Sequence, residues 1–325
     1  MNYIIVSNLL KPYFNFAIED FYLKNIDNDS LIVIMYVNDN SIIVGKNQNY
    51  LKEVDYKYII SNNVPVYRRA SGGGTVYHDK GNLNVSFILN RSNGFSNHKH
   101  SYFSEIINDF LIANGIQSNI GKRNEILVDN YKISGCAQYI YKNSILHHLT
   151  LLFDANLLNV YNSLKNNSNY YNDNHTCSFN NKVVNINNIN NSFKSIVDFQ
   201  NKLLKYLTDK FSLHKIQLNN ESKEIWDIAS NKYNKDEWNL FYNSNYCFSN
   251  EYLEGSNLIK IEIKVKKSFI DNFSITLNNK MYYIENATNK RHIFCELNKI
   301  LEEFYNKNMI SFKCMNMEKL VFKCF

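Results

Sequence analysis

Short apolar runs and one segment with helical spacing alternate along the first fifty residues. Residues 2–8 (NYIIVSN) predict a strand, and residues 31–37 (LIVIMYV) have the length and β-branched content of a buried strand. Between them, residues 13–26 (YFNFAIEDFYLKNI) carry apolar side chains at intervals of three and four, which predicts a helix. A further run at 41–46 (SIIVGK) follows the turn-forming triplet NDN, so we expect it to form a hairpin with residues 31–37.

The same patterns continue to about residue 211. Residues 83–89 (LNVSFIL) and 145–157 (ILHHLTLLFDANL) predict strands, and residues 124–140 (NEILVDNYKISGCAQYI) predict a hairpin that turns at Asp129-Asn130. Residues 101–115 and 196–211 carry apolar side chains at helical spacing, and the first of these helices ends at Gly115. Strands and helices mixed in this way predict an α+β fold with a mixed sheet and flanking helices.

Near residue 245 the pattern changes to that of a half-solvated sheet. Apolar and charged residues alternate from Leu258 to Lys266, and residues 291–307 (RHIFCELNKILEEFYNK) predict an amphipathic helix. We therefore expect a catalytic domain over residues 1–245 and a small α+β accessory domain over residues 246–325.

Composition excludes several classes of protein. No apolar run approaches the roughly 18 to 20 residues of a membrane span. The net charge is +6, but the lysines are scattered, so we expect neither membrane nor nucleic-acid partners. The six cysteines lack CxxC spacing, which favours reduced thiols over a zinc site. The chain begins with a strand-like run and shows no targeting segment, and the Asn-rich tract 163–192 reads as a surface loop.

Three consecutive glycines stand out in a chain that has ten. They are bracketed by Arg68, Arg69, Ser71, Thr75 and His78, and they match neither a P-loop nor the GxGxxG spacing. A bare backbone beside cationic and hydroxyl side chains can approach a phosphate or carboxylate closely. This pattern predicts an anionic ligand, although a flexible turn is the alternative.

Residues 69–88 (RASGGGTVYHDKGNLNVSFI) closely resemble the glycine-loop motif of the lipoate-protein ligases, within the biotin/lipoate-ligase superfamily. Further resemblances follow in the expected order at YFNFAIED, SIIVGKNQN, RNEILVDNYKISGCA, LHHLTLLFDANL and KVVNI. Together they cover about residues 1–245, and WNLFYNSNYCFS resembles the link to that family's accessory domain. The resemblance implies a biotin/lipoate-ligase-like catalytic domain.

The resemblance also implies an activity. Such ligases join lipoate to the α-phosphate of ATP with magnesium, release pyrophosphate, and pass the lipoyl group to a lysine of an acceptor protein. Neither step needs an enzyme nucleophile, so positioning and charge stabilisation carry the chemistry. The implied catalytic residue is Lys132, whose alternative is a solvated strand lysine, and Asn124 and Glu125 would bind the nucleotide, with Glu125 near magnesium. The implied substrate-binding residues are Arg69, Ser71, Gly72, Gly73, Gly74, Thr75, Val76, His78, Asn82, Ser134, Gly135, His148, Glu19 and Asn47.

Several positions leave alternatives open. Asn124 also suits a turn, and Glu125 stands where the family carries Asp, which weakens direct metal coordination. Val76 and Phe87 are expected to border the acyl tunnel. Tyr139 stands where bacterial ligases place an arginine over the adenylate, and Cys177 reads as a chance cysteine in the Asn-rich tract.

Two other functions stay open beside the ligase. One is a lipoyl or octanoyl transferase that uses a preformed adenylate or acyl-carrier protein, and the other is a lipoate-binding activator subunit. The implied acceptors are lipoyl domains of 2-oxoacid dehydrogenase E2 subunits and the glycine-cleavage H-protein. We expect a monomer, and the Asn-rich composition favours an AT-rich protist and a mitochondrial location over cytoplasm or plastid.

Overall fold

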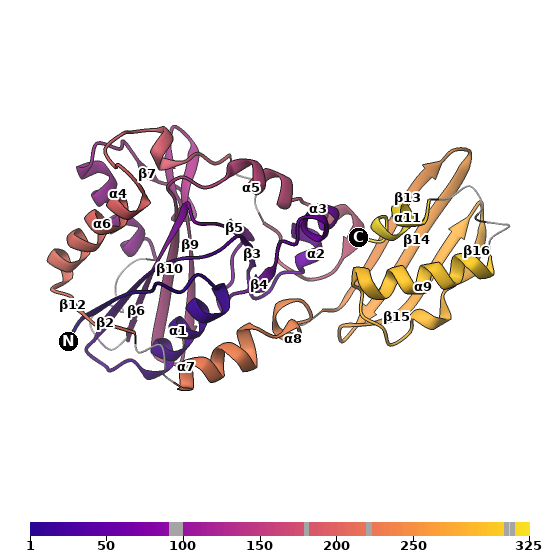
Figure 1. Ribbon diagram of the computed structural model, residues 1–325, viewed down its shortest axis with the longest axis horizontal. Helices are drawn as coiled ribbons and strands as arrows, with labels where there is room; N and C mark the ends of the chain where they lie inside the picture. Colours follow the sequence, from indigo (N-terminus) through magenta and orange to yellow (C-terminus); the bar gives the residue numbers. More distant parts are fainter. Residues whose placement is uncertain (91–99, 179–181, 219–222, 243, 309–311, 313–315) are drawn as a thin grey trace. The chain divides into compact units, whose positions relative to one another are not determined.

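The computed structural model describes the whole chain except residues 91–99, 179–181, 219–222, 243, 309–311 and 313–315 (Figure 1). The chain folds into two compact units. The first contains residues 1–46, 64–161 and 178–239, and the second contains residues 47–63, 162–177 and 240–325. The boundary at residue 245 stays a prediction of domain organisation, and the second unit adds two short earlier segments to the C-terminal part.

An eight-stranded mixed sheet organises the first unit, in the order β12-β1-β2-β6-β10-β9-β8-β7. The pairings of β1 with β2 and with β12 are parallel, and the other neighbours are antiparallel. This confirms the predicted α+β class with a mixed sheet. The strands are β1 (Tyr3–Val6), β2 (Leu31–Val37), β6 (Asn82–Asn90), β7 (Asn119–Ile120), β8 (Ile126–Val128), β9 (Tyr131–Tyr141), β10 (Ser144–Leu152) and β12 (His214–Lys215).

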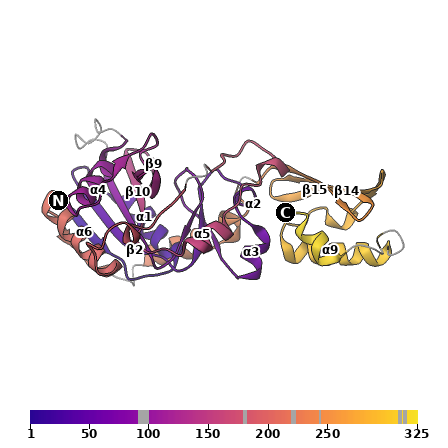
Figure 2. The same ribbon diagram turned by 90° about the horizontal axis from the view of Figure 1, so that it is seen from above.

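Helices cover both faces of this sheet (Figures 1 and 2). One face packs against α4 (Tyr102–Ala113) and α6 (Ile196–Phe211), and the other packs against α1 (Pro12–Asn25) and α7 (Lys223–Ile228). Along β6, the odd-numbered apolar side chains from Leu83 to Leu89 point to the α4 and α6 face, while Asn84, Ser86 and Ile88 alternate onto the other face. Polar side chains buried on the α1 face therefore mark the place of a site. Further helical elements are η3 (Ile186–Asn188), η4 (Ala229–Tyr233) and α8 (Asp236–Asn239) in this unit, and α5 (Leu157–Ser163), within which the first unit ends at Tyr161.

A separate three-stranded sheet joins β4 (Val66–Arg68), β3 (Ser41–Val44) and β5 (Val76–His78). The predicted hairpin of residues 31–37 and 41–46 is therefore wrong, because β2 pairs with β1 and β6 whereas β3 pairs with β4 and β5. Buried Asn38 explains the difference, since its side chain hydrogen-bonds to Asn15 and His78 instead of closing a turn. The triplet NDN carries the chain from one sheet to the other.

The predicted hairpin at Asp129-Asn130 is confirmed. Both residues have left-handed backbone angles, with φ values of 49° and 66°, as a two-residue turn between β8 and β9 requires. Asn and Asp tolerate this region better than most residues, which is why the sequence signal was readable.

The second unit contains an antiparallel sheet in the order β11-β13-β14-β15-β16. Alternation along β14 is confirmed, since Ile259, Ile261, Ile263 and Val265 are buried while Lys264 is exposed. No helix in the described part of the chain is long and apolar enough to span a bilayer. The elements of this unit are β11 (Tyr171–Asn172), β13 (Tyr246–Glu254), β14 (Asn257–Lys266), β15 (Phe269–Leu277), β16 (Lys280–Tyr283), α2 (Tyr50–Glu53), α3 (Tyr56–Ser61), α9 (Phe294–Lys307), α11 (Met317–Phe322), η2 (Ser168–Tyr170) and η5 (Glu285–Ala287).

Candidate functional site

The glycine loop runs from the end of β4 to the start of β5, and the Arg69 side chain hydrogen-bonds to it. The guanidinium donates to Ile43 O (3.1 Å), Gly72 O (2.7 Å), Gly74 O (2.7 Å) and Ser71 Oγ (3.0 Å). Burial lowers the pKa of Arg69 to about 10, so it stays charged at neutral pH. Most of its N–H donors are spent on the loop, which makes Arg69 a support for the loop's backbone.

The three glycines differ in what their backbone needs. Gly73 has φ of 88°, and a Cβ there would lie 3.0 Å from the Arg69 Nη2 and 3.5 Å from the Ala137 Cβ. A Cβ on Gly74 would lie 3.1 Å from the Ser178 Oγ, whereas one on Gly72 would meet nothing within 4 Å. Gly73 is thus required by conformation, and Gly72 leaves open space beside the loop.

A buried polar network connects the loop to the α1 face of the large sheet. The Ser71 Oγ lies 2.7 Å from the His148 Nε2, and the His148 Nδ1 lies 3.3 Å from the Glu19 Oε1. Glu19 also accepts hydrogen bonds from Tyr36 (2.9 Å) and from Ser86. This network fixes the hydroxyl of Ser71 and gives the buried carboxylate of Glu19 three partners.

His78, at the end of β5, is buried and neutral. Its Nδ1 accepts from the Asn38 Nδ2 at 2.9 Å, which leaves the proton on Nε2. Burial, with Arg69 and His148 adding to it, lowers the pKa of His78 to about 3. Within the described residues its Nε2 has no hydrogen-bond partner, so this N–H is available to a ligand.

Lys132 reaches back over β9 toward the loop. Its Nζ would lie 2.8 Å from a Cβ on Gly135, so a glycine at that position makes room for the ammonium. Burial lowers the pKa of Lys132, and no ion pair in the described part of the chain includes it. Lys132 is half-buried, and the neighbouring Cys136 and Glu125 act to raise its pKa without forming an ion pair with it. An ammonium in this setting is suited to an anionic substrate.

A model of the lipoyl protein ligase A/B catalytic domain matches residues 11–208. This chain belongs to the lipoate-protein ligase family. Lipoate-protein ligase 1 of Staphylococcus aureus is 36% identical to it over 276 residues, which cover 85% of this chain and 84% of that relative.

Two solved structures share the fold of this chain. The lipoate-bound crystal structure of P. falciparum LipL1 aligns with a TM-score of 0.63 and 25% identity, over 85% of each chain. The fold is also that of a lipoate-protein ligase A crystallised with ATP, with a TM-score of 0.60 and 22% identity over 74% of this chain and all of the other.

In this member of the family, Asn124 and Glu125 form a turn beside Lys132. Asn124 has φ of 62°, its Nδ2 lies 2.6 Å from the His100 Nδ1, and the Glu125 Oε2 accepts from the Arg123 backbone at 2.7 Å. No group of three His, Cys, Asp or Glu side chains that would suit a metal occurs in the described residues. A single carboxylate fits magnesium that arrives on ATP phosphates, since Mg²⁺ in such sites takes only one or two protein carboxylates.

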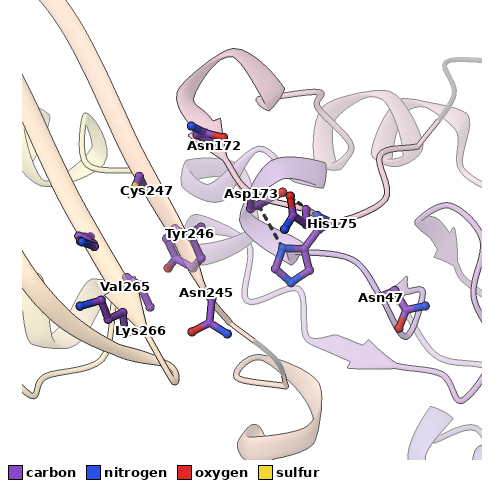
Figure 3. A pocket seen from close by; sticks show the side chains of 11 residues that line it. Asn47, Asn172, Asp173, His175, Asn245, Tyr246, Cys247, Val265 and Lys266 are labelled. Atoms are coloured by element: carbon purple, nitrogen blue, oxygen red, sulfur yellow. Dashed lines mark hydrogen bonds and ion pairs between the residues drawn. The ribbon is translucent and has the colours of Figure 1, made fainter.

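Asn47 is assigned to the second unit, directly after Lys46 of the first. It borders an open pocket of about 720 Å³ with Asp173 and His175 (Figure 3). The Asp173 carboxylate accepts from the Lys52 Nζ at 2.8 Å and from the Asn49 Nδ2 at 3.3 Å, and it lies 3.2 Å from the His175 Nδ1. Burial alone would raise the pKa of Asp173, but its hydrogen bonds with His175 and Lys52 lower it below the usual range. These contacts fix the positions of Asp173 and His175, which line the pocket.

The next three predicted residues, Thr75, Asn82 and Ser134, have contacts within the first unit. The Thr75 backbone N–H donates to the Ser178 Oγ at 2.8 Å, and the Asn82 Nδ2 donates to Asn84 at 3.1 Å. Ser134 pairs across the sheet with Leu151, in the core under α4 and α6, and its hydroxyl has no partner among the described residues.

Val76 and Phe87 do not border one tunnel. Val76 packs against the cluster on the α1 face, whereas Phe87 is fully buried on the α4 and α6 face and stacks on Phe103 at 4.2 Å. That expectation is wrong because alternation along β6 sends Phe87 and Ser86 to opposite faces.

Sequence reasoning missed Tyr36, Ser86 and Asn38, which complete the buried network. The only signal was a polar side chain within or just after an apolar run, as at Ser86 and Asn38. Tyr36 lies within the run of β2, where an aromatic residue is ordinary, and its hydroxyl contact with Glu19 depends on the tertiary fold.

Proposed function

We propose that this chain is an ATP-dependent, AMP-forming lipoate-protein ligase that performs both activation and transfer. The observation that carries the proposal is the half-buried Lys132 ammonium, which forms no ion pair among the described residues and folds over Gly135 beside the glycine loop. Lipoate and ATP bring a carboxylate and a phosphate that such an ammonium can hold together. Membership of the lipoate-protein ligase family supports these substrates.

In the first step, a lipoate carboxylate oxygen attacks the α-phosphorus of ATP. The bond from that phosphorus to the β-phosphate oxygen breaks, its electron pair leaves with pyrophosphate, and lipoyl-AMP remains. Lys132 would neutralise the carboxylate and the α-phosphate, while the glycine-loop amides approach the same anion. Binding of these anions would also restore a higher pKa to Lys132, since opposite charge favours the protonated form.

In the second step, the amine of an acceptor lysine attacks the lipoyl carbonyl carbon. The bond to the AMP oxygen breaks and its electron pair leaves with AMP, an amide forms, and the proton that the amine loses passes to solvent. His78 presents an Nε2–H, and the network of Glu19 and His148 fixes Ser71, so these residues would orient the lipoyl group. Magnesium would be held by the phosphates with Glu125, and it would neutralise phosphate charge.

The finer assignments belong to the same proposal. The acceptors would be lipoyl domains of 2-oxoacid dehydrogenase E2 subunits and the glycine-cleavage H-protein, whose acidic surfaces suit a chain of net charge +6. The chain would act as a monomer. The Asn-rich composition supports an AT-rich protist and a mitochondrial location.

The test is the intact mass of an apo lipoyl domain after incubation with the chain, lipoate, ATP and magnesium. Lys132→Met should abolish the lipoyl mass gain and leave the fold unchanged, while Lys142→Met serves as a control because this lysine is exposed in the turn after β9. A parallel reaction receives synthetic lipoyl-AMP.

Each outcome selects one function. A gain that needs ATP and is lost in the Lys132 variant supports the ligase. A gain from lipoyl-AMP alone would make the chain a transferase. An activator subunit would bind lipoate and give no mass gain by itself. It would increase the mass gain that a second ligase gives, compared with that ligase alone.

A further inference from the structure

Lys46 is fixed to the start of the glycine loop by its backbone. Its N–H donates to the Ser71 carbonyl at 2.8 Å, and its own carbonyl accepts from the Arg68 Nη1 at 3.2 Å. Arg68 is itself 1% exposed, so this anchor is rigid. The half-buried side chain of Lys46 therefore starts from a defined point beside the loop.

The ammonium of Lys46 lies over an aromatic ring of β9. Its Nζ is 5.4 Å from the centroid of Tyr139. Side chains alternate along a strand, so Gly135, Ala137 and Tyr139 share one face of β9 at intervals of about 7 Å. Lys132 approaches this face at Gly135, and Gly73 approaches it at Ala137.

The three groups thus follow one another along a single strand. Lys132 lies at one end, the glycine loop in the middle, and Lys46 at the other end. A substrate that carries several anionic groups in a row can meet one amide-rich loop and two ammonium groups here.

Charge pairing leaves Lys46 available for such a ligand. No ion pair in the described part of the chain includes it, whereas its cationic neighbour Lys232 is held by Asp20 at 3.0 Å. Arg69 spends most of its donors on the loop. An aromatic ring holds an ammonium weakly, so a phosphate can displace it.

We propose that Lys46 binds the β- and γ-phosphates of ATP and stabilises pyrophosphate as it leaves. This inference rests on the proposed ligase function. Lys132 would hold the carboxylate and the α-phosphate, and the next anionic groups of the same substrate lie along β9 toward Tyr139. Lys46 transfers no proton, because its ammonium only neutralises the charge that the breaking phosphorus–oxygen bond leaves on pyrophosphate.

The test compares Lys46→Met, Lys46→Arg and Lys142→Met in two assays. Lys142 is a matched control because its ammonium also lies over a ring of β9, 5.4 Å from the centroid of Tyr141, but outside the glycine loop. One assay measures lipoate-dependent release of pyrophosphate at varied ATP. The other measures transfer from synthetic lipoyl-AMP to an apo lipoyl domain.

Lys46→Met should raise KM for ATP about 10- to 100-fold, the range for loss of one charged hydrogen-bond partner. Lipoate affinity and transfer from lipoyl-AMP should stay within about twofold, and Lys46→Arg should keep most of the ATP affinity. An unchanged KM for ATP in Lys46→Met, or an equal loss of transfer from lipoyl-AMP, would overturn the proposal.

A separate measurement distinguishes failure of the ligase function itself. If the wild-type chain releases no pyrophosphate from lipoate and ATP, the proposed function fails. Equilibrium binding of ATP to wild type and Lys46→Met then still tests Lys46, since equal affinities refute its phosphate contact and weaker binding by the variant supports it.

Discussion

Alanine at Gly72 and at Gly73 separates two reasons for a run of glycines. Gly73 has φ of 88°, where an L side chain costs about 1–2 kcal/mol. Its new Cβ would also lie 3.0 Å from the Arg69 Nη2, which belongs to a guanidinium that four hydrogen bonds hold in place. Gly73→Ala should therefore destabilise the first unit by at least about 1–2 kcal/mol.

Gly72→Ala should behave in the opposite way. Its φ lies outside the left-handed range and its Cβ meets nothing within 4 Å, so the stability should stay equal or rise by about 0.4–1 kcal/mol. If the open space beside Gly72 receives the substrate, however, the added methyl group should raise KM for lipoate or ATP by about 10-fold or more.

Urea unfolding followed by circular dichroism gives the two stabilities, and lipoyl transfer gives the two KM values. The reasoning about conformation is refuted if Gly73→Ala is as stable as wild type, or if Gly72→Ala is the less stable of the two. Unchanged KM values in Gly72→Ala would show that the open side of the loop does not face the substrate.

Three further predictions concern the core and the buried titratable groups. Asp173→Asn should cost the second unit about 3–5 kcal/mol at pH 7, because Lys52 stays buried without its partner. The pKa of Asp173 is lowered in the folded state, so wild-type stability should fall as the pH drops below 3.8. The difference in urea midpoint between wild type and Asp173→Asn should therefore be smaller at pH 3 than at pH 7. Phe153→Ala should cost about 3–5 kcal/mol in urea unfolding, since this ring is 2% exposed, while exposed Leu253→Ala should stay within about 0.5 kcal/mol. His78, whose pKa is lowered to about 3, should stay neutral between pH 5 and 8 in ¹⁵N NMR. Because the unfolded chain binds the proton first, this histidine should reduce the stability of the fold as the pH falls below 6.5. A titration midpoint near 6.5 for His78 would contradict its burial.

Local signals in the sequence were sufficient for elements and for the glycine loop. The turn at Asp129-Asn130 and the alternation along β14 each depend on neighbouring residues, and both were predicted correctly. The loop could be recognised because its glycine, arginine and serine residues stabilise the same backbone conformation.

Long-range pairing was beyond reach of the same reasoning. β2 and β3 are adjacent in sequence, yet they enter different sheets because the Asn38 side chain bonds to Asn15 and His78, which lie far away in the chain. Assignment of Phe87 to the site failed for a related reason, since which face of a strand meets a ligand depends on the other elements packed there.

The second unit is assembled from three separated stretches of chain, so a truncation of one stretch affects the other two. Tyr56 stacks on Phe325 at 3.9 Å, and Tyr171 contacts Phe248 at 5.0 Å. A premature stop codon near residue 245 would remove Phe248 and Phe325, and it would expose the Tyr56 and Tyr171 rings that pack against them. Deletion of residues 240–325 alone would therefore leave residues 47–63 and 162–177 without the partners they have in this unit.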